Sequence, residues 1–100
     1  MSVIMMLRQK ADPAALEQYA SSHADQMLRV AEAGRSKGAI HHYFAAGDGE
    51  IVVIDEWPTE EAFREFFASQ SEIPEIMKGA GAQGRPEVSI FRKITTPDEF

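Results

Sequence analysis

The most informative part of this chain is the stretch Ile51–Phe66, IVVIDEWPTEEAFREF. Its first half is a run of apolar residues, which is typical of a buried strand. Pro58 ends that strand, and Thr59 can cap the free N–H groups of a following helix. The acidic residues Glu60 and Glu61 suit the positive end of that helix's dipole. The stretch therefore predicts a strand, a tight corner and an amphipathic helix.

Outward from this corner, the hydrophobic pattern predicts three further strands and one further helix. The tight turn Gly47-Asp48-Gly49 should join two of the strands as a hairpin, because Gly and Asp tolerate positive φ. The segment GAGAQGRP, Gly79–Pro86, is expected to be a flexible loop. The expected elements are strands over Val3–Leu7, Ala39–Ala46, Glu50–Trp57 and Val88–Ile94, one continuous helix over 13–35, and a helical region after Thr59 that breaks in two near Ser71.

This order, β-α-β-β-α-β, predicts an α+β, ferredoxin-like fold with a four-stranded antiparallel sheet and helices on one face. Val3, Met5 and Leu7 alternate with Ile4 and Met6, so both faces of the sheet should be apolar. A sheet of this kind needs a second cover, and a second copy of the chain packed face to face would supply it. We expect one domain over 1–96, forming a homodimeric barrel, and a polar tail over 97–100.

Composition limits the classes of partner. The 10 basic and 16 acidic residues give a net charge of −6, which argues against nucleic-acid and anionic-membrane partners. The chain has no Cys, so disulfides, thiolate metal sites and Cys nucleophiles are excluded. No stretch looks like a signal peptide or is long enough to span a bilayer. We therefore expect a soluble cytoplasmic protein.

The corner resembles the dimeric α+β barrel superfamily, and in particular the small, uncharacterised bacterial members of its antibiotic-biosynthesis-monooxygenase-like branch. That family often reads Glu-x-Trp, then an acidic helix with Ala and an aliphatic residue, then a His. Asp55, Trp57, Ala62 and Phe63 stand at the matching positions, and Phe66 stands at the His place. The resemblance implies a homodimeric α+β barrel that binds an aromatic molecule between helices and sheet.

The resemblance also bears on cofactors. In the cofactor-independent branch the substrate itself activates oxygen, so no cofactor is expected here. The haem-degrading branch is disfavoured, because this chain contains no Asn and Phe66 replaces the His. No His-x-His or His-x-x-x-His spacing occurs, so the sequence predicts no metal site.

Two histidines are candidate catalytic residues. The helical phase of His23 places it with Leu16 and Met27 on the face toward the sheet, as a general base in a cleft or as a hydrogen-bonded core histidine. His42 and His41 are adjacent on a strand and point to opposite faces, so one of them should look into the cleft.

Five further residues are candidate substrate contacts. Asp55 and Trp57 share one face, as a polar anchor and a flat aromatic wall, or as a structural seal of the strand end. Tyr43 could donate a hydrogen bond to a bound carbonyl. Phe66 and Met27 would line an apolar pocket if the core were incompletely packed.

Three functional hypotheses follow. The first is a monooxygenase-like enzyme for an aromatic small molecule, in which His23 or His42 helps to remove a phenolic proton and Trp57 stacks on the rings. The alternative is a non-catalytic homodimer that binds an apolar or aromatic small molecule. The third is a purely structural protein with a closed, fully packed core and no ligand. The sequence leaves this open, because the same Phe and Met residues could line a pocket or fill a core.

Overall fold

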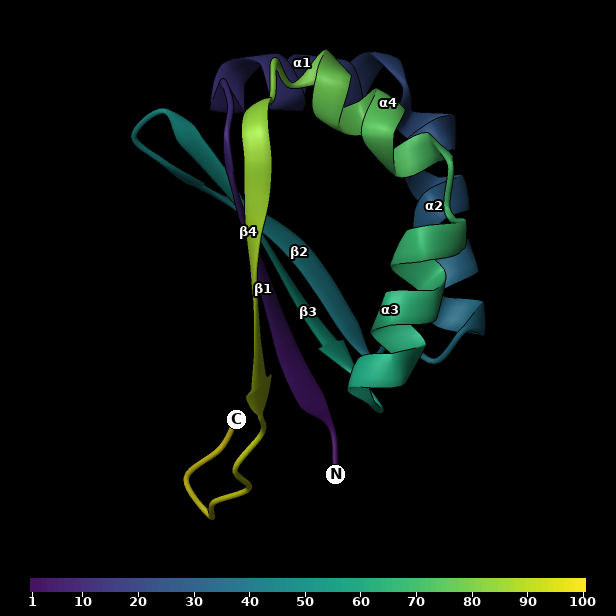
Figure 1. Ribbon diagram of the computed structural model, residues 1–100, viewed down its shortest axis with the longest axis vertical. Helices are drawn as coiled ribbons and strands as arrows, with labels where there is room; N and C mark the ends of the chain where they lie inside the picture. The colour runs from purple at the N-terminus through teal and green to yellow at the C-terminus, as the bar shows by residue number, and fades with distance from the viewer.

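Four antiparallel strands form one sheet in the order β2-β3-β1-β4, and every helix lies on the same side of it (Figure 1). The computed structural model describes all of residues 1–100. This arrangement confirms the predicted ferredoxin-like α+β fold. The strands are β1 (Val3–Lys10), β2 (His41–Gly47), β3 (Glu50–Trp57) and β4 (Gln83–Arg92), and the helices are α1 (Pro13–Ser22), α2 (Ala24–Ser36), α3 (Glu60–Ser69) and α4 (Glu72–Gly79).

The register of the sheet separates an inner face, under the helices, from an outer face. Val53 pairs with Leu7 on β1 and with Phe44 on β2, and these three residues lie on the inner face. Their strand neighbours point the other way, as the two-residue period requires. The outer face therefore carries a different apolar set, which includes Ile54 and Tyr43.

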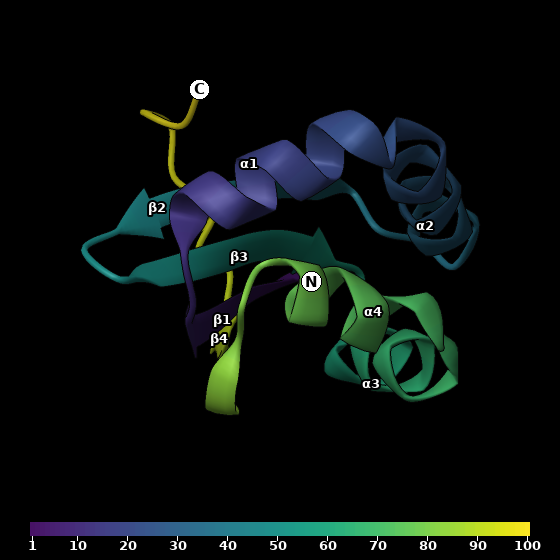
Figure 2. The same cartoon turned by 90° about the horizontal axis from the view of Figure 1, so that it is seen from above.

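The predicted single helix over 13–35 is wrong, because the chain leaves the helical conformation at His23 (φ −126°, ψ 41°). Ser22 sits just before the break, and its Oγ donates to the carbonyl of Gln18 at 2.8 Å. Such side-chain bonds compete with helix propagation. Figure 2 shows that α2 then runs in a different direction from α1. Residues of α1 and α2 that share a face in one continuous helix therefore do not share a face in the structure.

Strand β4 begins earlier than predicted, at Gln83, so the second half of the expected flexible loop belongs to the sheet. A bulge between Arg8 and Lys10 absorbs the change of register. Gly84 takes positive φ (75°), and the buried amide of Gln9 donates to the carbonyl of Gln83 at 2.9 Å. The glycine-rich sequence, which looks like a loop, therefore contains a β-bulge at the start of a strand. Hydrophobic periodicity alone does not predict such a bulge.

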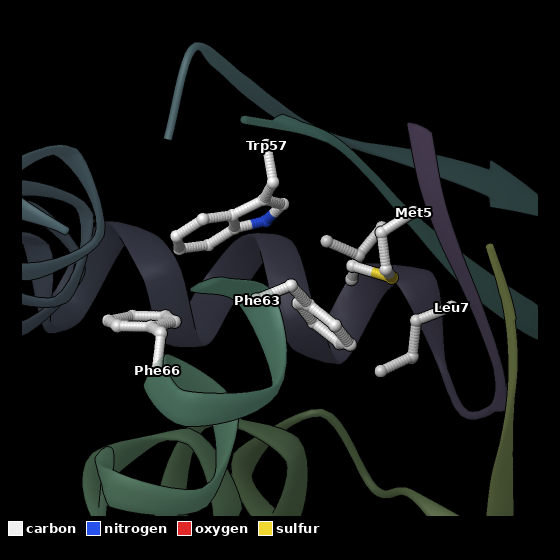
Figure 3. Close-up of a cluster of buried hydrophobic side chains, with 6 residues drawn as sticks. Met5, Leu7, Trp57, Phe63 and Phe66 are labelled. Atoms are coloured by element: carbon white, nitrogen blue, oxygen red, sulfur yellow. The ribbon is translucent and has the colours of Figure 1, made fainter. Parts of the chain in front are cut away.

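Helix α3 starts as predicted, with Thr59 accepting a hydrogen bond from the backbone N–H of Ala62 at 3.0 Å. Its apolar side packs on the sheet as part of one core cluster, shown in Figure 3. A second core cluster lies under α1 and α4 and is made mainly of smaller side chains. The first cluster contains Met5, Leu7, Val53, Trp57, Phe63 and Phe66, and the second contains Ala11, Leu16, Ile51, Ile76 and Ala80.

Candidate functional site

A pocket of about 380 Å³ lies between the inner face of the sheet and the helices α2, α3 and α4. This volume falls within the roughly 300–1,000 Å³ typical of small-molecule sites. Sixteen of its 21 lining residues are hydrophobic, so its interior suits an apolar ligand. Phe66 and Met27, which the sequence predicted as pocket residues, both line it.

Three of the lining residues, His42, Asp55 and Trp57, form a hydrogen-bonded group within the mostly apolar lining. His42 and Asp55 face each other across β2 and β3, with His42 Nδ1 2.7 Å from Asp55 Oδ1. Trp57, two residues further along β3, points to the same face and donates from Nε1 to Asp55 Oδ2 at 3.0 Å. Both oxygens of the Asp55 carboxylate are thus engaged, and Asp55 is only 7% exposed.

This contact orients the His42 ring. A carboxylate can only accept hydrogen bonds, so the proton shared with Asp55 belongs to Nδ1 of His42. In a neutral ring the Nε2 lone pair is then free to accept a proton. The His42 side chain is 42% exposed, while that of Asp55 is 10% exposed. The arrangement therefore presents an accessible base with a buried carboxylate behind it.

Trp57 lies deeper than a stacking platform would. It is 1% exposed, with its ring centroid 5.3 Å from that of Phe66 and 6.1 Å from that of Phe63 (Figure 3). A ligand can therefore reach only a small part of the indole. The side chain lines the pocket and fixes Asp55. Phe63 and Phe66 are also buried, whereas Phe67, which lines the pocket too, is 37% exposed and leaves more of its ring open to a ligand.

The structure places two predicted site residues away from this pocket. His23 is exposed at the junction of α1 and α2, where its ring stacks on Tyr19 with centroids 3.9 Å apart. Its predicted orientation toward the sheet is wrong, because the helix breaks at this residue. Tyr43 is 55% exposed on the outer face of β2, since strand alternation points it away from His42 and Phe44. It cannot contact a ligand in the pocket.

The sequence did not identify Arg35, Ile40 and Phe44 as pocket residues, although all three line it. Arg35 falls in the last turn of α2, and no motif distinguishes it from a solvent-exposed helix end. The pairing of His42 with Asp55, in contrast, can be predicted from the sequence. The short turn at Asp48-Gly49 fixes the hairpin register, and counting outward from it brings these two residues opposite each other.

A second buried carboxylate, Glu56, lies next to the site but on the outer face. Ser2 Oγ donates to it at 2.6 Å, Lys93 Nζ lies 3.5 Å away and His41 Nε2 3.9 Å away. The hydroxyl of Ser2, helped by the positive charge of Lys93, holds the pKa of Glu56 below its ordinary value. Glu56 is therefore a buried carboxylate on the outer face that is held by polar and basic neighbours.

No three His, Asp or Glu side chains lie close enough together to hold a metal ion. None of the four helices combines the length and apolarity needed to cross a membrane. No protein-family profile matches the sequence, and no curated protein sequence is significantly similar to it.

Solved structures do share the fold. The cofactor-independent oxygenase SnoaB from Streptomyces nogalater superposes with a TM-score of 0.64 at 20% identity, over 98% of each chain. A structure described as an antibiotic biosynthesis monooxygenase gives a TM-score of 0.63 at 12% identity, over 93% of this chain and 99% of its own. A conserved protein from Methanosarcina mazei Go1 gives 0.64 at 13% identity, over 94% of each chain. At these identities the likeness establishes a shared fold.

Proposed function

We propose that the protein is a homodimeric, cofactor-independent monooxygenase-like enzyme that acts on an aromatic small molecule with an acidic phenolic or benzylic proton. The observation that carries this proposal is the contact between His42 and Asp55 at the edge of a largely apolar pocket. A general base must be positioned next to its substrate proton, and Asp55 supplies that positioning. The neighbouring phenyl rings offer surface for an aromatic ligand.

The proposed reaction needs only the substrate and molecular oxygen. His42 Nε2 takes the proton, which leaves a delocalised aromatic anion in the pocket. The anion reduces oxygen and combines with it, so a ring CH₂ and O₂ become a ring C=O and H₂O. The apolar lining limits the access of bulk water to the anion. SnoaB, with the same fold, is described as a cofactor-independent oxygenase, and this supports the same class of chemistry here.

The proposed dimer rests on the outer face of the sheet. No helix covers this face (Figure 1), and Tyr43 and Phe91 on it are 55% and 52% exposed. Ile4 and Ile54 lie beside them and are only half-buried. A second copy packed on this face would bury these side chains. Native mass spectrometry should give a dimer mass, and a monomer at micromolar concentration would contradict this part of the proposal.

Oxygen uptake with a panel of anthrones and hydroquinones tests the activity. If His42 is the base, His42→Ala should lower turnover by about 10²- to 10⁴-fold. Asp55→Asn should also lower it, since the amide no longer fixes the Nδ1 proton. His23→Ala is the matched control, because His23 lies outside the pocket, and it should match the wild type. Equal uptake in the wild type and His42→Ala would refute the assignment.

The second candidate, a non-catalytic small-molecule-binding dimer, is favoured by the same predominantly apolar lining. It predicts that aromatic ligands raise the melting temperature and produce no oxygen uptake. A product formed with the wild type and absent with His42→Ala would count against it.

A further inference from the structure

We infer that Arg35 makes this pocket specific for an aromatic substrate that carries a carboxylate. The inference rests on the proposed function, because it concerns the ligand of the same pocket. Its basis is one juxtaposition: Arg35, which has no ion-pair partner, is among the residues that line a mostly apolar pocket, at the end of α2 that leads to the strand of His42.

The charges around the pocket single out Arg35. It is the only Lys or Arg among the 21 lining residues. The one lining carboxylate, Asp55, is buried and already holds His42 and Trp57. A ligand anion therefore meets a single fixed positive charge, and that charge is on an exposed residue. The interior beyond it is apolar and accepts the rings.

Arg35 makes no ion pair in a chain with an excess of acids. Acidic residues outnumber basic ones 16 to 10. Arg8, Arg29 and Arg64 each pair with a glutamate. Arg35 makes no such pair and donates no side-chain hydrogen bond. Its planar guanidinium is free to bind a carboxylate with two parallel hydrogen bonds.

A purely structural role at the end of α2 does not account for this side chain. The backbone N–H groups of Lys37 and Ala39 donate to the carbonyl of Gly34, at 3.1 and 3.0 Å. The N–H of Gly38 donates to the carbonyl of Arg35 at 3.0 Å, with Gly38 at φ 108°. The chain itself thus satisfies these carbonyls at the helix end. Lys37 also supplies a positive charge there without lining the pocket.

The proposed binding mode has two anchors. The carboxylate of the substrate pairs with Arg35, and its rings lie against the phenyl side chains of the pocket. The acidic proton then lies toward His42. Arg35 is a specificity-determining residue in this arrangement, and His42 is the base.

Isothermal titration calorimetry with anthracene-2-carboxylate and its neutral analogue anthracene-2-carboxamide tests the inference. The wild type should bind the carboxylate at least about tenfold more tightly, in line with a charge-assisted bidentate pair. Arg35→Gln should abolish this preference. Lys37→Gln removes a charge at the same helix end, outside the pocket lining, and should keep the preference.

The failures of the two proposals are distinguishable. Equal binding of the two compounds by the wild type would overturn the role of Arg35 and leave the aromatic pocket standing. A preference that survives Arg35→Gln, or that disappears in Lys37→Gln, would overturn it as well. Absence of binding by both compounds would contradict the pocket proposal itself.

Discussion

The space between the helices and the sheet is filled at one end and open at the other. At the filled end, under α1 and α4, Ile51 and Ala80 are 0% exposed. At the open end, bounded by α2, α3 and the adjoining side of α4, the pocket of about 380 Å³ remains. Both ends are lined by apolar side chains, so hydrophobicity does not explain the difference. Side-chain size does, because it sets how closely a helix can approach its neighbours.

Small residues allow close approach at the filled end. The position of a Cβ on Gly79 would lie 2.1 Å from Cδ2 of Tyr19, so α4 comes this close to α1 only because Gly79 has no side chain. At the open end, the rings of Trp57, Phe63 and Phe66 lie between α3 and the sheet (Figure 3). Large rings hold the helix away from the sheet, and the pocket forms beside them.

The largest expected effect comes from Ile51→Ala at the filled end. A fully buried Ile leaves a cavity that its tightly packed neighbours cannot fill, at a cost of roughly 2–5 kcal/mol in unfolding free energy. Ile40→Ala is the matched change at the open end, where Ile40 is 49% exposed, and should cost about 1 kcal/mol or less. Urea denaturation measures both. Equal losses would erase the distinction between the two ends.

Gly79→Ala tests the close approach directly. The new methyl group would overlap the Tyr19 ring, and overpacking of this kind costs about 1–3 kcal/mol. Thermal denaturation should show a lower melting temperature. The double variant Gly79→Ala, Tyr19→Ala removes the ring that the new methyl group would overlap. If its melting temperature returned to the wild-type value, the other packing contacts of Tyr19 would contribute little to stability. A neutral Gly79→Ala would show that α1 and α4 can separate at little cost.

Gly34→Ala is the matched glycine substitution at the open end. Its Cβ would lie 3.5 Å from the Phe66 ring, which is ordinary van der Waals contact. Because Ala favours helix over Gly by up to about 1 kcal/mol, the variant should be as stable as the wild type or slightly more stable. The methyl group also narrows the pocket, so calorimetry should show weaker binding of anthracene-2-carboxylate. A loss of stability as large as that of Gly79→Ala would contradict the comparison.

The smallest expected effect is a pH dependence from Glu56, which lies on β3 next to Asp55 of the open end but points to the outer face. Because the pKa of Glu56 is lowered on folding, its stabilisation is present at neutral pH and is lost as pH falls through that lowered pKa. Glu56→Gln should therefore melt below the wild type at pH 7, and the two should converge once the pH has fallen below the lowered pKa of Glu56. The exposed Glu65→Gln serves as control. A gap that stays constant with pH would rule out this linkage.

The sequence predicts the fold better than it predicts the site. Strand alternation and the corner after Trp57 predict the four-stranded sheet and the start of α3, and the hairpin turn is enough to align His42 with Asp55. The error at His23 arose because helical periodicity assumes an unbroken helix, and two serines and a histidine give little sign of a break. The pocket depends on the distances between the helices and the sheet. Neither strand alternation nor helical periodicity predicts these distances.

The hairpin of β2 and β3 has a consequence for how this protein could change. His42, Asp55 and Trp57 all come from this one hairpin, while Met27 and Arg35 come from α2. The proposed base and the proposed selectivity residues thus lie in separate segments of the chain. Substitutions in α2 could therefore change the proposed ligand preference without altering the contact between His42 and Asp55. Moving the hairpin to another sheet of the same strand order would also require a partner for Trp57, which packs against Phe63 and Phe66 of α3.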